Sequence, residues 1–117
     1  MDGLELALAC REYADNKKAE DIVVLDVHEV SSITDYFVIV SGTSEPHVRS
    51  IWNEIVGSLK QDHQLIPPKL EGTQFNNWVV IDYFDVIVHV MSRETREKYD
   101  LEGLWNDAAL VEPEVTS

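Results

Sequence analysis

The chain of 117 residues is long enough for one hydrophobic core and short of the length at which cores usually split, so we expect one domain. Its 9 Lys and Arg against 22 Asp and Glu give a net charge of −13, which repels nucleic-acid phosphates and attracts a basic protein surface. This charge argues against sequence-specific nucleic-acid binding. It leaves open whether the acidic residues serve a basic protein partner or only solubility.

The cysteine count and the N-terminus indicate where the protein works. Cys10 is the single cysteine, so neither an intramolecular disulfide nor a thiolate metal cluster can form. Asp2 and Glu5 stand where a secretory signal would carry basic residues, and no apolar run approaches the roughly 20 residues that cross a bilayer. We therefore expect a cytoplasmic protein without a membrane anchor.

The first half of the chain predicts a helix, two strands and a second helix. Leu4–Lys18 has helical periodicity with apolar residues on two sides, which suggests contacts on both. The runs Ile22–Leu25 and Tyr36–Val40 are rich in β-branched residues and predict two adjacent strands. Ser44 can cap the helix that follows, in which apolar residues recur every three or four positions from Val48 onward.

The second half predicts a hairpin and a final helix. Two prolines after Ile66 favour an extended connection or an edge strand. Trp78–Asp82 and Val86–Val90 are then two strands joined by a short turn. Ser92 can cap one short final helix that runs toward Trp105.

These elements predict an α/β fold of the α+β type. The order is α-β-β-α-(β)-β-β-α, with a mixed β-sheet flanked by helices in a single domain. We expect the domain to cover residues 1–107. The polar residues 108–117 are expected to form a flexible acidic tail.

The pattern of chemically active side chains does not predict a catalytic or metal site. The four histidines lack paired ligand spacing, and His89 lies within an apolar strand, sharing its face with Ile87 and Met91. The turn Ser41–Ser44 between a strand and a helix resembles the glycine-serine turn of polymerase-beta-like nucleotidyltransferases. The paired carboxylates of those enzymes are absent after this turn, where Glu54 is the one acidic residue between positions 51 and 59. We expect no catalytic residues, no metal and no cofactor.

Several blocks of sequence together resemble the ribosomal silencing factor family, also called Iojap-related. The resemblance extends from about Leu4 to Asp107 and keeps the order and spacing of every block. One departure is Phe84, where the family often has a glycine-like turn residue. The blocks are Leu25-Asp26, Thr34–Ile39, Ser41–Ser44, Trp78–Tyr83, Asp85–Val90, Arg96–Glu102 and Leu104-Trp105.

The resemblance implies a translational repressor that binds the large ribosomal subunit through its protein fourteen and blocks joining of the small subunit. It also implies a nucleotidyltransferase-like fold without the active site, and a homodimer when the protein is free. A role in assembly of the large subunit is an alternative, because organellar relatives are linked to it. A nucleotidyltransferase-like enzyme is the less favoured one.

Aromatic and acidic side chains near the ends of the predicted elements are our candidates for the docking surface. Large amphipathic rings suit an interface anchor, and carboxylates suit a rim that faces Lys and Arg. Each ring could equally border the core, and the carboxylates could simply be solvated. The candidate partner-binding residues are Trp78, Asp82, Tyr83, Asp85, Tyr99, Asp100 and Glu102.

Overall fold

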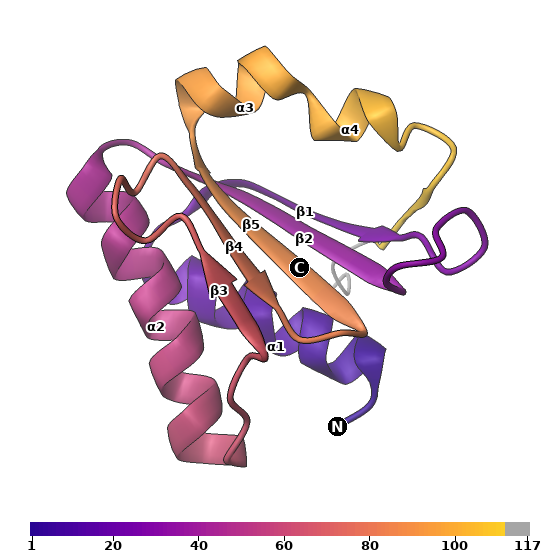
Figure 1. Ribbon diagram of the computed structural model, residues 1–117, viewed down its shortest axis with the longest axis horizontal. Coiled ribbons are helices and arrows are strands. Elements are labelled where there is room, and N and C mark those ends of the chain that lie inside the picture. Colours follow the sequence, from indigo (N-terminus) through magenta and orange to yellow (C-terminus); the bar gives the residue numbers. More distant parts are fainter. Residues whose placement is uncertain (112–117) are drawn as a thin grey trace, which may run out of the picture.

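The computed structural model describes residues 1–111 as one mixed sheet with helices on both faces (Figure 1). This confirms the predicted single α+β domain and the predicted order of its main elements. The helices are α1 (Gly3–Asn16), α2 (Glu45–His63), α3 (Arg93–Tyr99) and α4 (Leu101–Leu104). The strands are β1 (Glu20–Asp26), β2 (Tyr36–Gly42), β3 (Lys69–Glu71), β4 (Trp78–Asp82), β5 (Val86–Ser92) and β6 (Ala109–Leu110).

Side-chain caps set where the three longer helices begin. Asp2 accepts a hydrogen bond from the Glu5 backbone N–H at 2.8 Å and so starts α1. The predicted cap at Ser44 is confirmed, since its hydroxyl accepts from the N–H of His47 at 3.2 Å. Ser92 starts α3 in the same way, accepting from the N–H of Thr95.

The sheet has the strand order β3-β4-β5-β2-β1-β6. The two central strands, β2 and β5, run parallel, and every other neighbouring pair is antiparallel. Because β2 and β5 are covered on both faces, both faces of these strands are apolar, and nearly every one of their residues is buried. Of the two alternatives for the segment before Trp78, an extended connection or an edge strand, the structure has the edge strand, β3.

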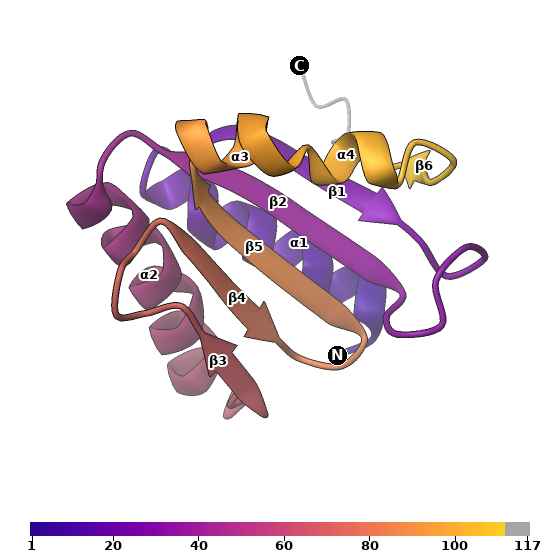
Figure 2. The same cartoon turned by 45° about the horizontal axis from the view of Figure 1, so that its top comes forward.

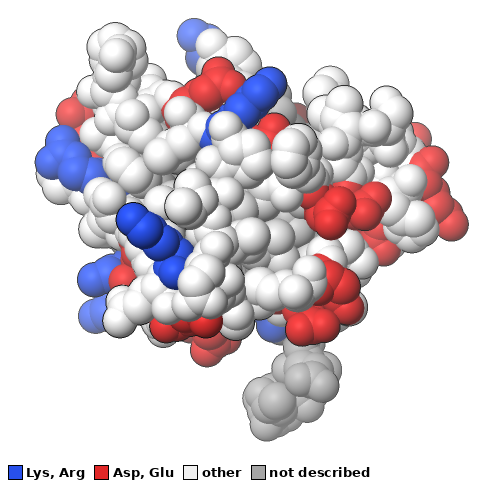
Figure 3. All heavy atoms as spheres, turned by 60° about the horizontal axis from the view of Figure 1, so that its bottom comes forward, with Lys and Arg blue, Asp and Glu red and all other residues white. Residues whose placement is uncertain are grey.

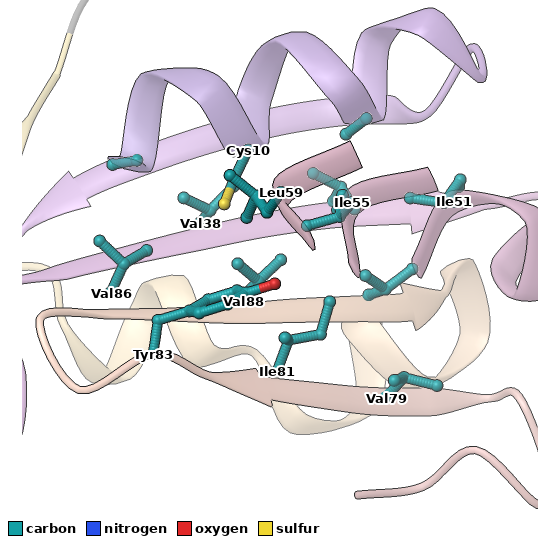
Figure 4. Packing of buried hydrophobic residues seen from close by; sticks show 14 of the residues in the cluster. Cys10, Val38, Ile51, Ile55, Leu59, Val79, Ile81, Tyr83, Val86 and Val88 are labelled. Carbon is teal, nitrogen blue, oxygen red and sulfur yellow. The ribbon is translucent and has the colours of Figure 1, made fainter. Parts of the chain in front are cut away.

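The main core lies between the sheet and the pair α1 and α2 (Figure 4). Ile51, Ile55 and Leu59 form the buried stripe of α2, as their spacing predicts. Cys10 is buried in the same cluster, and desolvation raises the pKa of its thiol to about 12. The thiol therefore stays protonated and acts as a small apolar side chain.

Two predictions about the C-terminal part were wrong. The single final helix is broken at Asp100, whose backbone adopts a left-handed conformation with φ of 41° between α3 and α4. The segment expected to be a tail from residue 108 is partly in the sheet, because Ala109 and Leu110 pair with Asp26 and Leu25 of β1. Residues 112–117 of that predicted tail lie outside the described residues.

Candidate functional site

The two faces of the sheet are covered unequally. Whereas α1 and α2 cover one face, α3 and α4 cross the other only above part of the sheet, and they leave β3 and most of β4 uncovered (Figure 2). A cavity of about 240 Å³ lies on this second face. We call it the open-face groove. It is lined by Ile33, Phe37, Val80, Ile87, His89, Leu101 and Trp105.

Strand alternation explains why the floor of the groove is apolar. Phe37 pairs with Ile87, and Val80 pairs with His89, so these four side chains share one face of three neighbouring strands. The wall of the groove is formed by Leu101 of α4 and by Trp105, the residue that follows α4. The ring centroid of Trp105 lies 5.3 Å from that of Phe37. The long β1–β2 connection supplies Ile33.

Ile33 is the most exposed apolar side chain of the groove. With 67% of its surface exposed, it stands beside the groove and contributes little to the core. An exposed apolar side chain next to an apolar cavity is typical of a protein-binding surface.

His89 is the buried polar residue of the groove floor. Only 9% of it is exposed, and its Nδ1 accepts a hydrogen bond from the indole N–H of Trp78 at 3.0 Å. Burial lowers the pKa of His89 to about 4, because the charged imidazolium would be desolvated. The ring is therefore neutral near pH 7.

The structure places four of the seven predicted site residues, Trp78, Tyr99, Asp100 and Glu102, near one end of the hairpin. The rings of Trp78 and Tyr99 pack against each other at a tilt of 45° with centroids 4.8 Å apart, and Tyr99 keeps 50% of its surface exposed. Asp100 accepts from the N–H of Gly103 and caps α4. The Glu102 carboxylate receives two hydrogen bonds from the guanidinium of Arg96, at 2.9 and 3.1 Å.

Arg96 connects α3 and α4 to the sheet. Its Nη1 donates to the hydroxyl of Ser41 at the end of β2, at 2.9 Å, while its other nitrogens bind Glu102. Sequence reasoning placed Glu102 on the docking surface, whereas its carboxylate in fact holds this connection. The spacing of six residues between Arg96 and Glu102 gave no sign of the pairing, since it is not a helical contact spacing.

Asp82 and Asp85 lie at the opposite end of the hairpin from Trp78. The carboxylate of Asp82 accepts from the N–H of Phe84 at 2.8 Å and so shapes the turn, whose Phe84 has a φ of 74°. Asp85 is exposed. The seven predicted residues therefore do not form one cluster, because three residues of extended strand separate Trp78 from Asp82.

Tyr83 is a correction to the predicted docking set. It points into the core on the helix-covered face, beside Val88 (Figure 4), and only 6% of it is exposed. Its ring is therefore not available to a partner. Alternation along the chain was the missing signal: Tyr83 follows Val79 and Ile81, which share its face, while Trp78, Val80 and Asp82 point to the other.

A larger, charged hollow of about 590 Å³ lies between β1 and the segment of α3 and α4, and Ser41 is the residue that the Ser41–Ser44 turn contributes to its lining. Its two arginines already have acidic partners, because Arg93 binds Glu20 and Arg96 binds Glu102. The turn itself is closed by internal bonds, since the Thr43 N–H donates to Nδ1 of His47 at 2.8 Å. The arrangement offers no unneutralised cation to a phosphate.

Residues 1–111 contain no group of three or more His, Cys, Asp or Glu side chains placed to hold a metal ion. Within this same part of the chain, no helix has the length and hydropathy needed to cross a membrane.

Comparison with known proteins agrees with this geometry. A family model described as ribosomal silencing factor during starvation matches residues 2–117. The ribosomal silencing factor of Halalkalibacterium halodurans is 40% identical over 97% of this chain and 97% of its own length. That of Bacillus subtilis is also 40% identical, over 91% of this chain and 86% of its own length. A mouse protein named mitochondrial assembly of ribosomal large subunit protein 1 is 38% identical over 76% of this chain, which covers 40% of it.

Two solved structures are similar to this protein over nearly the whole chain. A crystal structure of a Chromobacterium violaceum protein matches with a TM-score of 0.87 and 28% identity, covering all of this chain and 94% of that one. A Bacillus halodurans structure matches with a TM-score of 0.77 and 37% identity, over 94% and 96% of the two chains. With a family model that spans nearly the whole sequence and two bacterial relatives at 40% identity, the chain belongs to the ribosomal silencing factor family.

Proposed function

We propose that this protein binds the large ribosomal subunit through ribosomal protein fourteen, blocks joining of the small subunit and thereby represses translation in the cytoplasm. It acts by occupying a surface, without turnover and without a cofactor. Family membership supports the ribosomal role. The observation that carries the docking step is the open-face groove, an apolar cavity left uncovered on a protein of net charge −13.

The size and lining of the groove suit a protein partner better than a small molecule. Its 240 Å³ is below the roughly 300–1,000 Å³ of typical small-molecule pockets, and it accommodates one or two side chains. Ile33 is a largely exposed part of its lining, and the half-exposed Tyr99 extends the contact area beyond it. An apolar centre with a charged surround is the usual anatomy of an interface.

The charge of the molecule favours a basic protein over RNA as the direct contact. Figure 3 shows the side of the molecule away from α3 and α4, on which Asp and Glu gather toward the right of the view, while Lys and Arg lie mainly to the left and top. Proteins that bind nucleic acid carry Lys and Arg to contact the phosphates. A ribosomal protein that binds RNA is therefore basic, and its surface complements the acidic surface of this protein. Among the predicted residues, we retain Trp78, Tyr99 and Asp85 as contacts, and assign Asp82, Asp100 and Glu102 to shaping the surface beside them.

The test is co-sedimentation of the purified protein with large ribosomal subunits of Bacillus subtilis. Ile33→Asp places a charge beside the groove and should weaken binding about tenfold or more, as loss of an interface anchor does. Ile66→Asp is the matched control, because Ile66 is 66% exposed and does not line the groove. Equal binding by the two variants would place the docking surface elsewhere.

Blocking and assembly make different predictions. A silencing factor added to purified, mature subunits should reduce the yield of joined ribosomes in a sucrose gradient. The assembly role, suggested by the name of the mouse relative, requires instead that immature large subunits accumulate when the protein is removed from cells.

The free protein is proposed to be a homodimer. Sedimentation velocity at micromolar concentration should show a species larger than the 13.3 kDa chain. A pure monomer at that concentration would refute the dimer and leave the docking proposal intact.

A further inference from the structure

Phe84 is a bulky apolar residue at the tip of the hairpin formed by β4 and β5. With 69% of its surface exposed, it belongs to neither apolar cluster of the core. Most of the apolar area of its ring stays in water, so the ring contributes little to the stability of the fold. Core packing therefore does not explain why this position carries an aromatic side chain.

The backbone of Phe84 is also strained. Its φ of 74° lies in the left-handed region, where a residue with a Cβ is disfavoured. The N–H of Asp85 donates to the C=O of Tyr83 at 3.0 Å, and a bond of this span around a positive φ defines a rare and strained γ-turn. Glycine adopts a positive φ without this strain. Exposure and backbone strain thus both count against a phenylalanine at this position.

The turn is held in this conformation by hydrogen bonds on both sides of Phe84. Its own N–H donates to the carboxylate of Asp82 at 2.8 Å. The next C=O along the chain, that of Asp85, accepts from the N–H groups of Asp35 and Tyr36 at 3.1 and 3.0 Å. A ring on a backbone that is fixed in advance loses little conformational freedom when a partner binds it.

These bonds join the hairpin turn to the surface that carries the open-face groove. Asp35 and Tyr36 end the β1–β2 connection, and the same connection carries Ile33, which lines the groove and is 67% exposed. Figure 1 and Figure 2 both show the β4–β5 turn and the β1–β2 connection at the same end of the sheet. Phe84 therefore extends the apolar contact area of the groove at this end.

The charges around Phe84 indicate what kind of surface it fits. Asp35 and Asp85 are exposed, and Asp82 is half-buried. Among the described residues, none of these three carboxylates forms an ion pair with Lys, Arg or His. The hairpin from Trp78 to Ser92 contains neither Lys nor Arg. An apolar ring with unpaired carboxylates beside it is complementary to an apolar pocket that Lys and Arg surround.

We propose that Phe84 is an interface anchor, which inserts into an apolar pocket bordered by Lys and Arg on the ribosomal protein that this chain binds. This inference rests on the proposed function and adds a named anchor and the chemistry of its complement. An anchor of this kind explains why an exposed and strained phenylalanine stands in the turn. It also means that stability and binding oppose each other at this position.

Phe84→Gly tests this opposition, with thermal unfolding and binding measured on the same protein. Glycine relieves the strain, and this gain exceeds the added freedom of the unfolded chain, so the melting temperature should rise by about 2–5 °C. Affinity for purified Bacillus subtilis large subunits and for isolated ribosomal protein fourteen should fall about tenfold or more. A melting temperature below that of wild type, or unchanged affinity, would overturn the inference.

Two further variants control for the ring and for its position. Phe84→Tyr keeps an aromatic ring in the turn and should bind within about threefold of wild type. Phe75→Ala removes an equally exposed ring, 70% exposed, from the loop before β4, at the other end of that strand, and should leave binding unchanged. A loss of affinity in Phe75→Ala as large as in Phe84→Gly would overturn the inference, because general loss of apolar surface would then explain both.

Four outcomes separate this inference from the proposed function. If wild type fails to bind large subunits, the proposed function fails and the inference fails with it. If wild type binds and Ile33→Asp does not, while Phe84→Gly binds normally, only the inference fails. If Phe84→Gly weakens binding to whole subunits and leaves binding to isolated ribosomal protein fourteen unchanged, the ring contacts RNA or another protein, and the inference is wrong. If it changes self-association alone, the partner of the ring is a second copy of this chain, and the inference is again wrong.

Discussion

At the scale of single residues, burial separates aromatic side chains that look alike in the sequence. Tyr83 and Tyr99 both stand near the end of an element, next to acidic residues. Tyr83 lies in the core, with 6% exposed, whereas Tyr99 packs against Trp78 with half its surface in solvent. The first therefore affects stability, and the second is the one available for binding.

Substitutions at Tyr83 should change stability in opposite directions. Its hydroxyl is buried without a hydrogen-bond partner among the described residues, and desolvation raises its pKa far above the ordinary range. Tyr83→Phe removes this unmatched group, so the free energy of unfolding should stay equal or rise by about 1 kcal/mol. Tyr83→Ala empties a core position and should lower it by about 3–5 kcal/mol.

Urea denaturation of the two variants checks this prediction. Co-sedimentation of Tyr83→Phe with large subunits should equal that of wild type, since the ring does not reach the surface. Weaker binding by a Tyr83→Phe protein of normal stability would restore Tyr83 to the docking set.

At the scale of elements, α3 and α4 depend on one polar connection. Their helices are short, 7 and 4 residues, and α4 contributes no buried residue. Arg96 joins both to β2 through Ser41 and Glu102, with the guanidinium nearly buried. Since Leu101 and Trp105 form the groove wall, this connection also determines the shape of the groove.

Breaking the connection should loosen the wall of the groove before it unfolds the domain. Glu102→Gln leaves the buried guanidinium with a neutral partner and should lower the free energy of unfolding by about 1–2 kcal/mol. Amide hydrogen exchange should increase mainly between residues 96 and 105. Glu97→Gln is the control, because that carboxylate is exposed and makes none of these bonds. Unchanged exchange in Glu102→Gln would show that apolar packing alone holds the wall.

At the scale of the whole molecule, the acidic charge acts on association through its distribution as well as its sum. A net charge of −13 speeds the approach of a basic partner from any direction, whereas carboxylates near the docking surface also orient it. Substitutions with the same effect on net charge can therefore separate these two contributions.

The substitutions Asp85→Lys and Glu12→Lys each change the net charge by +2. Asp85 is an exposed residue of the hairpin turn, and Glu12 is an exposed residue of α1. We expect Asp85→Lys to slow association with large subunits several-fold at about 50 mM salt, and to have less effect at about 300 mM, where screening is stronger. Glu12→Lys should have a smaller effect. Stopped-flow or surface-binding kinetics across a salt series provides the measurement, and equal effects of the two variants would mean that only the summed charge matters.

The sequence by itself determined the elements and the family. Helix caps at Ser44 and Ser92, the stripe of Ile51, Ile55 and Leu59, and the apolar runs of β2 and β5 are local patterns, so they could be read correctly without the fold. The break at Asp100 was missed, because a left-handed non-glycine residue inside a helical pattern has no strong local signal.

The tertiary structure alone decided which side chains share a surface. The groove combines Ile33, Val80, His89 and Trp105 from four separate segments, and the pairing of β4 with β5 places Val80 opposite His89. Which strands become neighbours depends on how the whole chain buries its apolar surface. A sequence pattern of period two shows that the side chains of a strand alternate between two faces, but it does not show which of these faces a helix will cover. The unequal cover of the two faces, which leaves the groove open and turns Tyr83 inward, follows from that global packing.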